Sequence, residues 1–245
     1  MPAKSPTKPR TATPAAWLTA RRQLLRAEKA HQRRGDALAA RRRELPWVKI
    51  GKDYVFDSPK GRVSLAGLFA GRSQLVVQHF MLGAGWEEGC KSCSYMLDHL
   101  SATPVHLAAR DVSFAVVSRA PLAEILPFKK RMGWDVNWVS AAGTGFNEDF
   151  HVSFDPAAVA QGPVRYNYAL RPFPYEEAPG ISVFARDETG AVYHTYSTYG
   201  RGVEVAMGTY HLLDLVPKGR DEAKFDYGME WVRHHDRYRH ARRRS

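Results

Sequence analysis

The two cysteines of the 245-residue chain, Cys90 and Cys93, lie three positions apart in the segment GWEEGCKSCS. Such a pair can be a redox couple, half of a metal site, or two buried thiols that happen to be neighbours. An apolar run at residues 74–82 and a short loop precede it, which predicts that Cys90 begins a helix. Helix N-termini stabilise thiolates and lower their pKa. We therefore expect Cys90 to attack a disulfide and Cys93, one turn further in, to resolve the mixed disulfide.

Charged neighbours would tune this chemistry. Lys91 adds a positive charge beside Cys90, whereas Glu87 and Glu88 would raise the pKa of the thiol and oppose the helix. A carboxylate can also relay a proton to a thiol. For at least one of two adjacent glutamates in a loop, a solvated position is the more ordinary expectation.

Other uses of the pair find less support. Structural zinc needs about four ligands, and adding His99 and His106 gives the spacing C-x2-C-x5-H-x6-H, which matches no common zinc module. A c-type haem needs His directly after the second cysteine, where this chain has Ser94. We expect no metal and no cofactor. Two inert, buried thiols remain the alternative.

Hydrophobic patterning predicts an α/β layer structure with a mixed sheet. Apolar runs at 74–82 and 112–118 indicate two buried central strands, each followed by helical segments. Two more strands flank a turn at 187–190, and a closing helix is expected over 202–216. Four aromatic residues are expected in the core: Trp134, Trp138, Phe146 and Phe150.

The net charge of +11 is concentrated at the two ends of the chain. Residues 1–46 carry twelve Lys or Arg against three acids and residues 231–245 carry six against one, whereas residues 47–230 carry eighteen against twenty-one. Basic ends are usually solvated arms. They could contact an acidic partner such as nucleic acid, although no motif supports this.

Three parts of the chain are expected. Residues 1–46 form a basic arm, with a disordered start and then a helix that bears an apolar stripe and is divided at Gly35. The stripe would pack on the body or on a partner chain, which permits a homo-oligomer. Residues 47–230 form the domain, with a Pro- and Tyr-rich insertion at about 151–178, and residues 231–245 form a solvated basic tail that includes HHDRYRH.

The beginning of the sequence has no apolar run of the secretory type. No stretch approaches the roughly 18 apolar residues of a membrane-spanning helix. We expect a soluble, cytoplasmic protein with no membrane partner. In that compartment the cysteine pair is not expected to be a permanent structural disulfide.

Several segments resemble one bacterial family. GRVSLAGLFAGRSQLVV is similar to the region ahead of the active site in thiol peroxidases and cytochrome-maturation thioredoxins. With SRAPLAEILPFKKRMGWDVNWVS, FNEDFHVSF and HLLDLVPKGRDE, the chain resembles the thioredoxin-like family known as domain of unknown function 899 over about residues 15–240. The resemblance implies a thioredoxin-like fold, with a central mixed sheet flanked by helices, and a cysteine site.

The resemblance also assigns residues. The thioredoxin pattern W-C-x-x-C makes Cys90 the nucleophile and Cys93 the resolving thiol, with Trp86 as a wall of the site. Proteins with this pattern have a cis-proline that faces the cysteines. In this chain Ile181 occupies the position of that proline, and Pro179 lies two residues earlier. Trp86, Lys91 and Ile181 are therefore the candidate substrate-binding residues.

The activating motif of peroxiredoxins, P-x-x-x-T-x-x-C, is absent, since Gly83 and Glu87 occupy its Pro and Thr positions ahead of Cys90. We therefore predict a thiol-disulfide oxidoreductase that acts on a disulfide-containing protein or a small thiol. The alternative is a redox-responsive binding or sensor protein whose basic arms dock an acidic partner without turnover.

Overall fold

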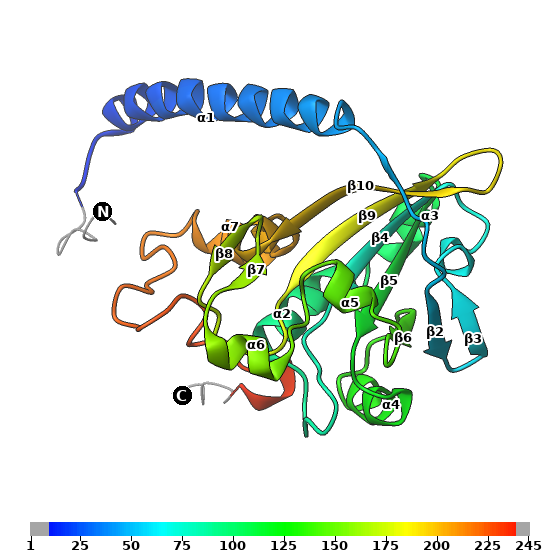
Figure 1. Ribbon diagram of the computed structural model, residues 1–245. Coiled ribbons are helices and arrows are strands. Elements are labelled where there is room, and N and C mark those ends of the chain that lie inside the picture. Colours follow the sequence, from blue (N-terminus) through cyan, green and yellow to red (C-terminus); the bar gives the residue numbers. More distant parts are fainter. Residues whose placement is uncertain (1–9, 239–245) are drawn as a thin grey trace.

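The computed structural model describes residues 10–238 and is built on one eight-stranded mixed sheet (Figure 1). Its strand order is β1-β10-β9-β4-β5-β6-β2-β3. The strands are β1 (Val48–Lys49), β2 (Val55–Ser58), β3 (Gly61–Ser64), β4 (Gln74–His79), β5 (Val112–Ser118), β6 (Trp138–Ser140), β9 (Gly180–Arg186) and β10 (Val192–Tyr199).

The centre of the sheet has the connectivity of a thioredoxin-like fold. Strand β4 runs parallel to β5 and antiparallel to β9, which pairs antiparallel with β10. Helix α2 (Lys91–Leu100) and the short α3 (Pro104–Ala108) connect β4 to β5, and α4 (Leu122–Arg131) follows β5. The predicted mixed sheet, its two buried central strands and the flanking helices are confirmed.

The two faces of β4 separate the core into layers. Leu75 and Val77 lie on one face, in an apolar cluster with Phe146 and Phe184. Gln78 points to the other face, where its amide donates a hydrogen bond of 3.1 Å to the carbonyl oxygen of Cys93 in α2. The side-chain alternation of a strand thus ties α2 to the middle of the sheet.

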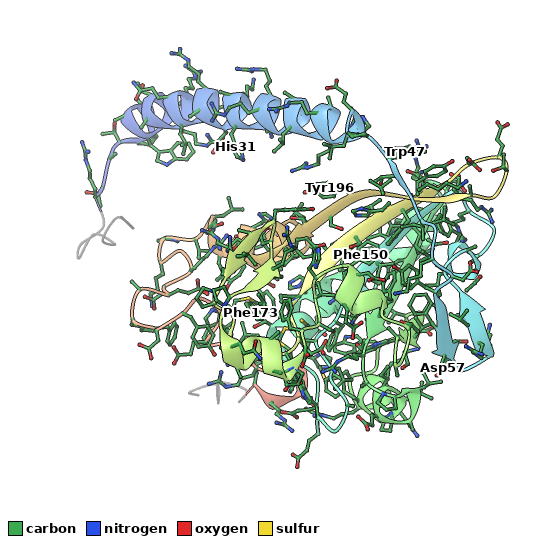
Figure 2. All side chains as sticks on the ribbon, viewed as in Figure 1. His31, Trp47, Asp57, Phe150, Phe173 and Tyr196 are labelled. Atoms are coloured by element: carbon green, nitrogen blue, oxygen red, sulfur yellow. The ribbon has the colours of Figure 1, made fainter. Side chains whose placement is uncertain are left out.

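The four predicted core aromatics are all buried. Phe146 and Phe150 belong to the cluster on the face away from α2; Figure 2 shows Phe150 within the packed body. Trp134 and Trp138 belong to the cluster that packs α2 and α4 onto the sheet. These rings therefore hold both layers in place.

The segment at 151–178 carries its own small elements, which follow α5 (Phe146–Asp149). They are the helix α6 (Pro156–Gln161) and the antiparallel pair β7 (Val164–Tyr166) and β8 (Ala169–Arg171). The hydroxyl of Tyr166 donates to the carbonyl oxygen of Pro179 at 2.9 Å and accepts from the amide of Gly200 at 2.8 Å. The segment is thereby fixed beside the beginning of β9 and the end of β10.

The N-terminal arm differs from the prediction in the course of its helix, whereas packing of the apolar stripe on a partner chain stays a prediction. Helix α1 (Pro14–Arg43) is unbroken at Gly35, because one interior glycine costs only about 1 kcal/mol relative to alanine and the helix around it is long. It also has no buried residue and stands apart from the body of the same chain (Figures 1 and 2). The Arg42 guanidinium, over the Tyr196 ring at 5.6 Å, is one contact it does make.

The expected single helix over 202–216 is two helices. A 3-10 helix, η2 (Gly200–Ala206), is separated from α7 (Gly208–Leu213) by Met207, whose φ of −114° and ψ of 76° are not helical. Because of this break, the Met207 side chain packs in a buried cluster with Tyr95 and Met96. Burial of one large apolar side chain, about 1.5–3 kcal/mol, outweighs the continuation of a short helix.

The expected solvated tail is packed on the domain as far as the structure describes it. Residues 231–238 include η3 (His235–Arg237), and Val232 and His234 are buried. The prediction of a solvated segment is therefore wrong for 231–238; residues 239–245 lie outside the described part. Within residues 10–238, no helix is both long and apolar enough to cross a membrane.

Candidate functional site

The loop between β4 and α2 brings Cys90 to the helix start. The Cys90 amide donates to the carbonyl oxygen of Met81 at 3.0 Å, so the loop folds back on the end of the strand. Gly89 makes this path feasible, since a Cβ there would lie 2.5 Å from Phe80 Cε1 and 2.7 Å from Phe128 Cε1. Cys90 is the N-cap residue of α2, as the sequence predicts.

The two free thiols are unequal in exposure and in acidity. Cys90 is half-buried and Cys93 is buried. A hydrogen bond from the Cys93 thiol is the largest cause that lowers the pKa of Cys90 to about 6; burial opposes it, and backbone N–H groups of Cys93 and Ser92 add to it. The same contact with Cys90, together with burial, raises the pKa of Cys93 well above its usual value. The arrangement therefore favours a Cys90 thiolate beside a protonated Cys93.

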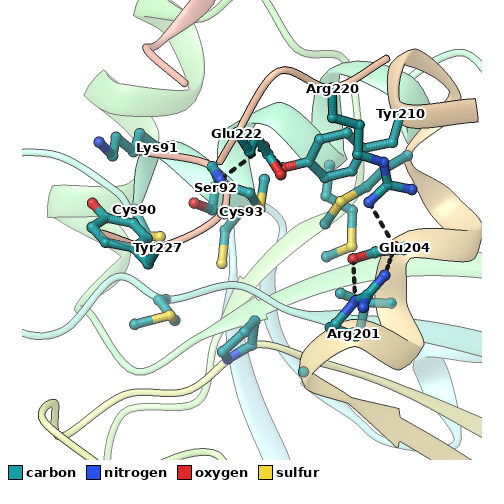
Figure 3. Close-up of a pocket in the computed structure, with 18 of the residues that line it drawn as sticks. Cys90, Lys91, Ser92, Cys93, Arg201, Glu204, Tyr210, Arg220, Glu222 and Tyr227 are labelled. Atoms are coloured by element: carbon teal, nitrogen blue, oxygen red, sulfur yellow. Dashed lines mark hydrogen bonds and ion pairs between the residues drawn. The ribbon is translucent and has the colours of Figure 1, made fainter. Parts of the chain in front are cut away.

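Lys91, a candidate substrate-binding residue, has partners in the C-terminal segment. Its ammonium group donates to the carbonyl oxygen of Glu230 at 3.0 Å and lies 5.9 Å from the centre of the Tyr227 ring; Figure 3 shows Lys91 and Tyr227 near Cys90. The causes that lower the pKa of Cys90 begin with hydrogen bonds from Cys93 and Ser92. Lys91 thus holds the C-terminal segment against α2.

A cavity of about 1600 Å³ borders both cysteines (Figure 3). Trp86 lines it, in the position of a wall, and its ring packs so closely over Gly83 that a Cβ there would lie 2.9 Å from Nε1. Pro179 also lines the cavity, whereas Ile181 is buried in the cluster that contains Tyr95 and Met96. Every peptide bond described between residues 10 and 238 is trans. Trp86 and Pro179 therefore line the same cavity as the cysteines, whereas Ile181 does not line it.

A buried carboxylate that the sequence analysis does not single out acts on Cys93 through its charge. Glu177 is 1% exposed, accepts a hydrogen bond of 2.7 Å from the Ser153 hydroxyl and pairs with the guanidinium of Arg119. Burial raises its pKa, against these two hydrogen-bonding partners. The charge of Glu177 in turn raises the pKa of Cys93. Its only sequence signal is its place in PYEEAPG, two residues ahead of Pro179.

The two glutamates ahead of Cys90 have separate environments. Glu87 is exposed. Glu88 is in ion pairs with Arg131 at 2.9 Å and Arg237 at 2.7 Å. Partial burial would raise its pKa, but the hydrogen bond from Arg131 and the nearby positive charges lower it. Glu88 therefore anchors the loop to α4 and to the C-terminal segment.

Of the two histidines considered for zinc, His99 is engaged elsewhere. His99 Nε2 lies 2.7 Å from the Thr209 hydroxyl, and its Nδ1 lies 2.6 Å from the carbonyl oxygen of Tyr95. Over the part of the chain that the structure describes, no three or more His, Cys, Asp or Glu side chains are grouped to hold a metal ion.

The strand order of the sheet and the helix α2 that follows β4 give the protein a thioredoxin-like fold. The family model described as "Bacterial protein of unknown function (DUF899)" matches residues 6–238, and the chain belongs to this family. A search of curated proteins returned no match.

Solved structures give weaker similarities. Peroxidoxin BcpB from Mycobacterium tuberculosis is 15% identical, with 66% of this chain and 96% of that chain covered and a TM-score of 0.39. The mitochondrial 2-Cys peroxiredoxin from Plasmodium falciparum is 12% identical, with 69% and 94% covered and a TM-score of 0.40. A putative protein disulfide isomerase from Bacteroides thetaiotaomicron is 15% identical, with 73% and 97% covered and a TM-score of 0.37. These are partial superpositions, so the fold is assigned from the strand order above.

Proposed function

We propose that the protein is a thiol-disulfide oxidoreductase in which Cys90 is the nucleophile and Cys93 the resolving thiol. The observation that carries the proposal is the unequal acidity of two adjacent thiols on a cavity wall: the pKa of Cys90 is lowered to about 6 and that of Cys93 is raised. A thiolate at neutral pH is the species that attacks a disulfide. The neighbouring thiol of Cys93 stays protonated during this attack and reacts in the second step.

The reaction has two exchange steps. The Cys90 thiolate attacks one sulfur of a substrate disulfide, a mixed disulfide forms, and the other half of the substrate leaves as a thiolate that takes a proton from solvent. Cys93 then loses its proton and attacks the Cys90 sulfur, which releases the second half of the substrate. The substrate disulfide is reduced by two electrons, and the Cys90–Cys93 disulfide that results is reduced again by an external dithiol.

Glu177 is suited to accept the proton of Cys93. Once Cys90 is in the mixed disulfide, its negative charge no longer raises the pKa of Cys93. A carboxylate whose own pKa is raised by burial is a better proton acceptor than an exposed one. Glu177 is 1% exposed and its charge is felt at Cys93, which supports this role.

The test combines the redox potential of the Cys90–Cys93 pair with two variants. Free thiols are trapped with a mass-shifting alkylator across a series of dithiothreitol buffers, and we expect one two-electron transition within about −120 to −270 mV, the range of known oxidoreductases. Cys93→Ser should accumulate a mixed disulfide with substrate, and Cys90→Ser should form none. Thiols that never pair, or unchanged reductase activity in Cys90→Ser, would reject the proposal. Oxidation-dependent binding of an acidic partner without turnover would favour the sensor alternative instead.

A further inference from the structure

We propose that the cavity beside Cys90 binds the apolar substituents of a neutral, low-molecular-weight disulfide, so that substrates are selected by their hydrophobic bulk. The inference rests on the proposed function and adds the class of substrate. It is carried by the side chains that form the cavity and by the way their charges are paired.

The cavity collects most of the methionines of the protein. Four of the six, Met81, Met96, Met207 and Met229, line it together with both cysteines. They come from the loop after β4, from α2, and from the segments on either side of α7. Methionine is flexible and polarizable, so a methionine-lined surface adapts to apolar groups of different shape.

Aromatic side chains complete the apolar lining. Trp86 stands on the side of the loop that leads to Cys90, and Tyr166 and Phe173 come from the segment that precedes β9. Pockets for small organic ligands are lined mainly by such hydrophobic and aromatic groups and typically measure about 300–1,000 Å³. The cavity here, about 1600 Å³, has room for substituents much larger than those of a minimal disulfide.

The charged groups on the far wall are partnered with one another (Figure 3). Arg220 pairs with Asp214 at 2.8 Å and with Glu204 at 3.1 Å, and Arg201 pairs with the same Glu204 at 2.8 Å. The Glu222 carboxylate accepts hydrogen bonds from the Tyr210 hydroxyl and the Trp231 indole N–H. Because these charged side chains already have partners, no charged ligand is needed to neutralise them. A neutral ligand can bind without breaking these interactions.

The position of Cys90 connects the cavity to the chemistry. Both cysteines border the cavity, but Cys90 is only half-buried whereas Cys93 is 1% exposed, so Cys90 is the sulfur that a ligand can reach. A disulfide whose substituents lie among Met81, Trp86 and Met229 therefore has its sulfur atoms at the cavity wall that Cys90 forms. Binding of the substituents and presentation of the sulfur become one event.

The test is a homologous series of di-n-alkyl disulfides, from diethyl to dibutyl, reduced by the full-length protein with excess dithiothreitol. The disulfide bond has the same reactivity along the series, so each rate is divided by the uncatalysed rate with dithiothreitol. We expect the relative kcat/KM to rise about fourfold for each methylene group that enters the cavity, since a buried methylene contributes about 0.8 kcal/mol. Exchange with every member at one relative rate would overturn this inference and leave the proposed function standing. Absence of exchange with all of them would overturn the proposed function, and the inference with it.

Variants locate the effect. Met229→Gln and Met207→Gln, which put a polar amide on the wall, should flatten the dependence on chain length, and Met207→Leu should restore it. Leu215→Gln is the matched control, because Leu215 is 80% exposed and does not line the cavity. Equal alkylation rates of Cys90 with iodoacetamide in all variants would show that the site is folded. A length dependence that survives both glutamine variants would contradict the assignment of the cavity.

Two charged disulfides test whether the cavity prefers a neutral substrate. Dithiodipropionate and cystamine are close in length to dipropyl disulfide but carry two negative or two positive charges. We expect the neutral compound to be favoured over both by tenfold or more in relative kcat/KM. Lys218, which is exposed at the cavity, would be the group to recruit an anion. A preference for dithiodipropionate would therefore overturn the neutral class of substrate.

Discussion

The imidazole Nε2 of His234 lies 2.8 Å from the carbonyl oxygen of Gly89, so a residue near the C-terminus holds the peptide group immediately ahead of Cys90. The ring is buried and makes a T-shaped contact with Phe128, with 5.5 Å between the ring centroids. The start of α2 is therefore stabilised by a segment that lies 145 positions further along the chain.

His234→Ala should lower the free energy of unfolding by about 2–4 kcal/mol, because a buried carbonyl group loses its donor and a buried ring leaves a cavity. Urea denaturation measures the change. His235→Ala is the matched control: its side chain is 43% exposed and bonds to Asp98, and exposed pairs contribute about 0–1 kcal/mol. Equal effects of the two substitutions would contradict the role given to His234.

Much of the site could be predicted from local sequence signals. The buried-strand pattern at 74–82, the loop and the following helix place Cys90 at a helix start, and this placement depends only on residues close in sequence. The mixed sheet follows from the same signals.

What could not be predicted depends on contacts between distant segments. The charge of Glu177, which lies just ahead of β9, acts on Cys93 because β9 pairs with β4, and His234 reaches Gly89 from 145 positions further along the chain. Glu177 belongs to no periodic pattern or motif, and the segment HHDRYRH, which begins at His234, gives no local sign of this contact. The break of the predicted closing helix at Met207 has a similar cause, since only the folded cluster with Tyr95 and Met96 shows what Met207 gains.

Cys93→Ala should raise the pKa of Cys90, because the hydrogen bond from the Cys93 thiol is the largest cause that lowers it. In the unaltered protein, alkylation of Cys90 by iodoacetamide should rise with a midpoint near pH 6 and level off above it. In the variant the midpoint should move towards the usual 9.0, and the rate at pH 6.5 should fall by roughly tenfold or more. Cys93→Ser, which keeps a donor, should shift it less. A midpoint unchanged in Cys93→Ala would show that the helix start alone sets the acidity of Cys90.

His79 predicts a loss of stability on acidification. Burial is the largest cause that lowers its pKa from 6.5 to about 3, and its Nε2 is bonded to the Ser182 hydroxyl at 2.8 Å. Between pH 6.5 and pH 3, His79 therefore binds a proton in the unfolded chain but not in the folded protein. The free energy of unfolding falls as the pH drops through this range. The slope from one such group is about 1.4 kcal/mol per pH unit.

Urea unfolding at pH 7, 6 and 5 measures this slope. His79→Gln removes the titrating group and keeps a polar side chain, so its unfolding free energy should depend less steeply on pH, even though the substitution is itself destabilising. His31→Gln on the exposed helix α1 is the control and should retain the full slope. Parallel profiles for the unaltered protein and His79→Gln would contradict the assignment.

Glu177→Gln should slow the second exchange step and spare the first. The amide cannot accept the proton of Cys93, whereas the Cys90 thiolate is stabilised by groups at the helix start. In single-turnover experiments with a chromogenic disulfide, release of the first thiol should keep its rate, and release of the second should slow by about tenfold at pH 7. The second step should then recover as the pH rises and solvent hydroxide takes over.

Glu176→Gln provides the matched control for that experiment. Glu176 precedes Glu177, pairs with the same Arg119 at 3.3 Å and has a side chain that is 45% exposed. The two variants thus remove a carboxylate from one guanidinium, but only Glu177 is buried where its charge acts on Cys93. A general loss of packing around Arg119 would affect both release steps and leave no recovery at high pH. If both variants slow the second step equally, the effect arises from Arg119 and Glu177 is not the proton acceptor.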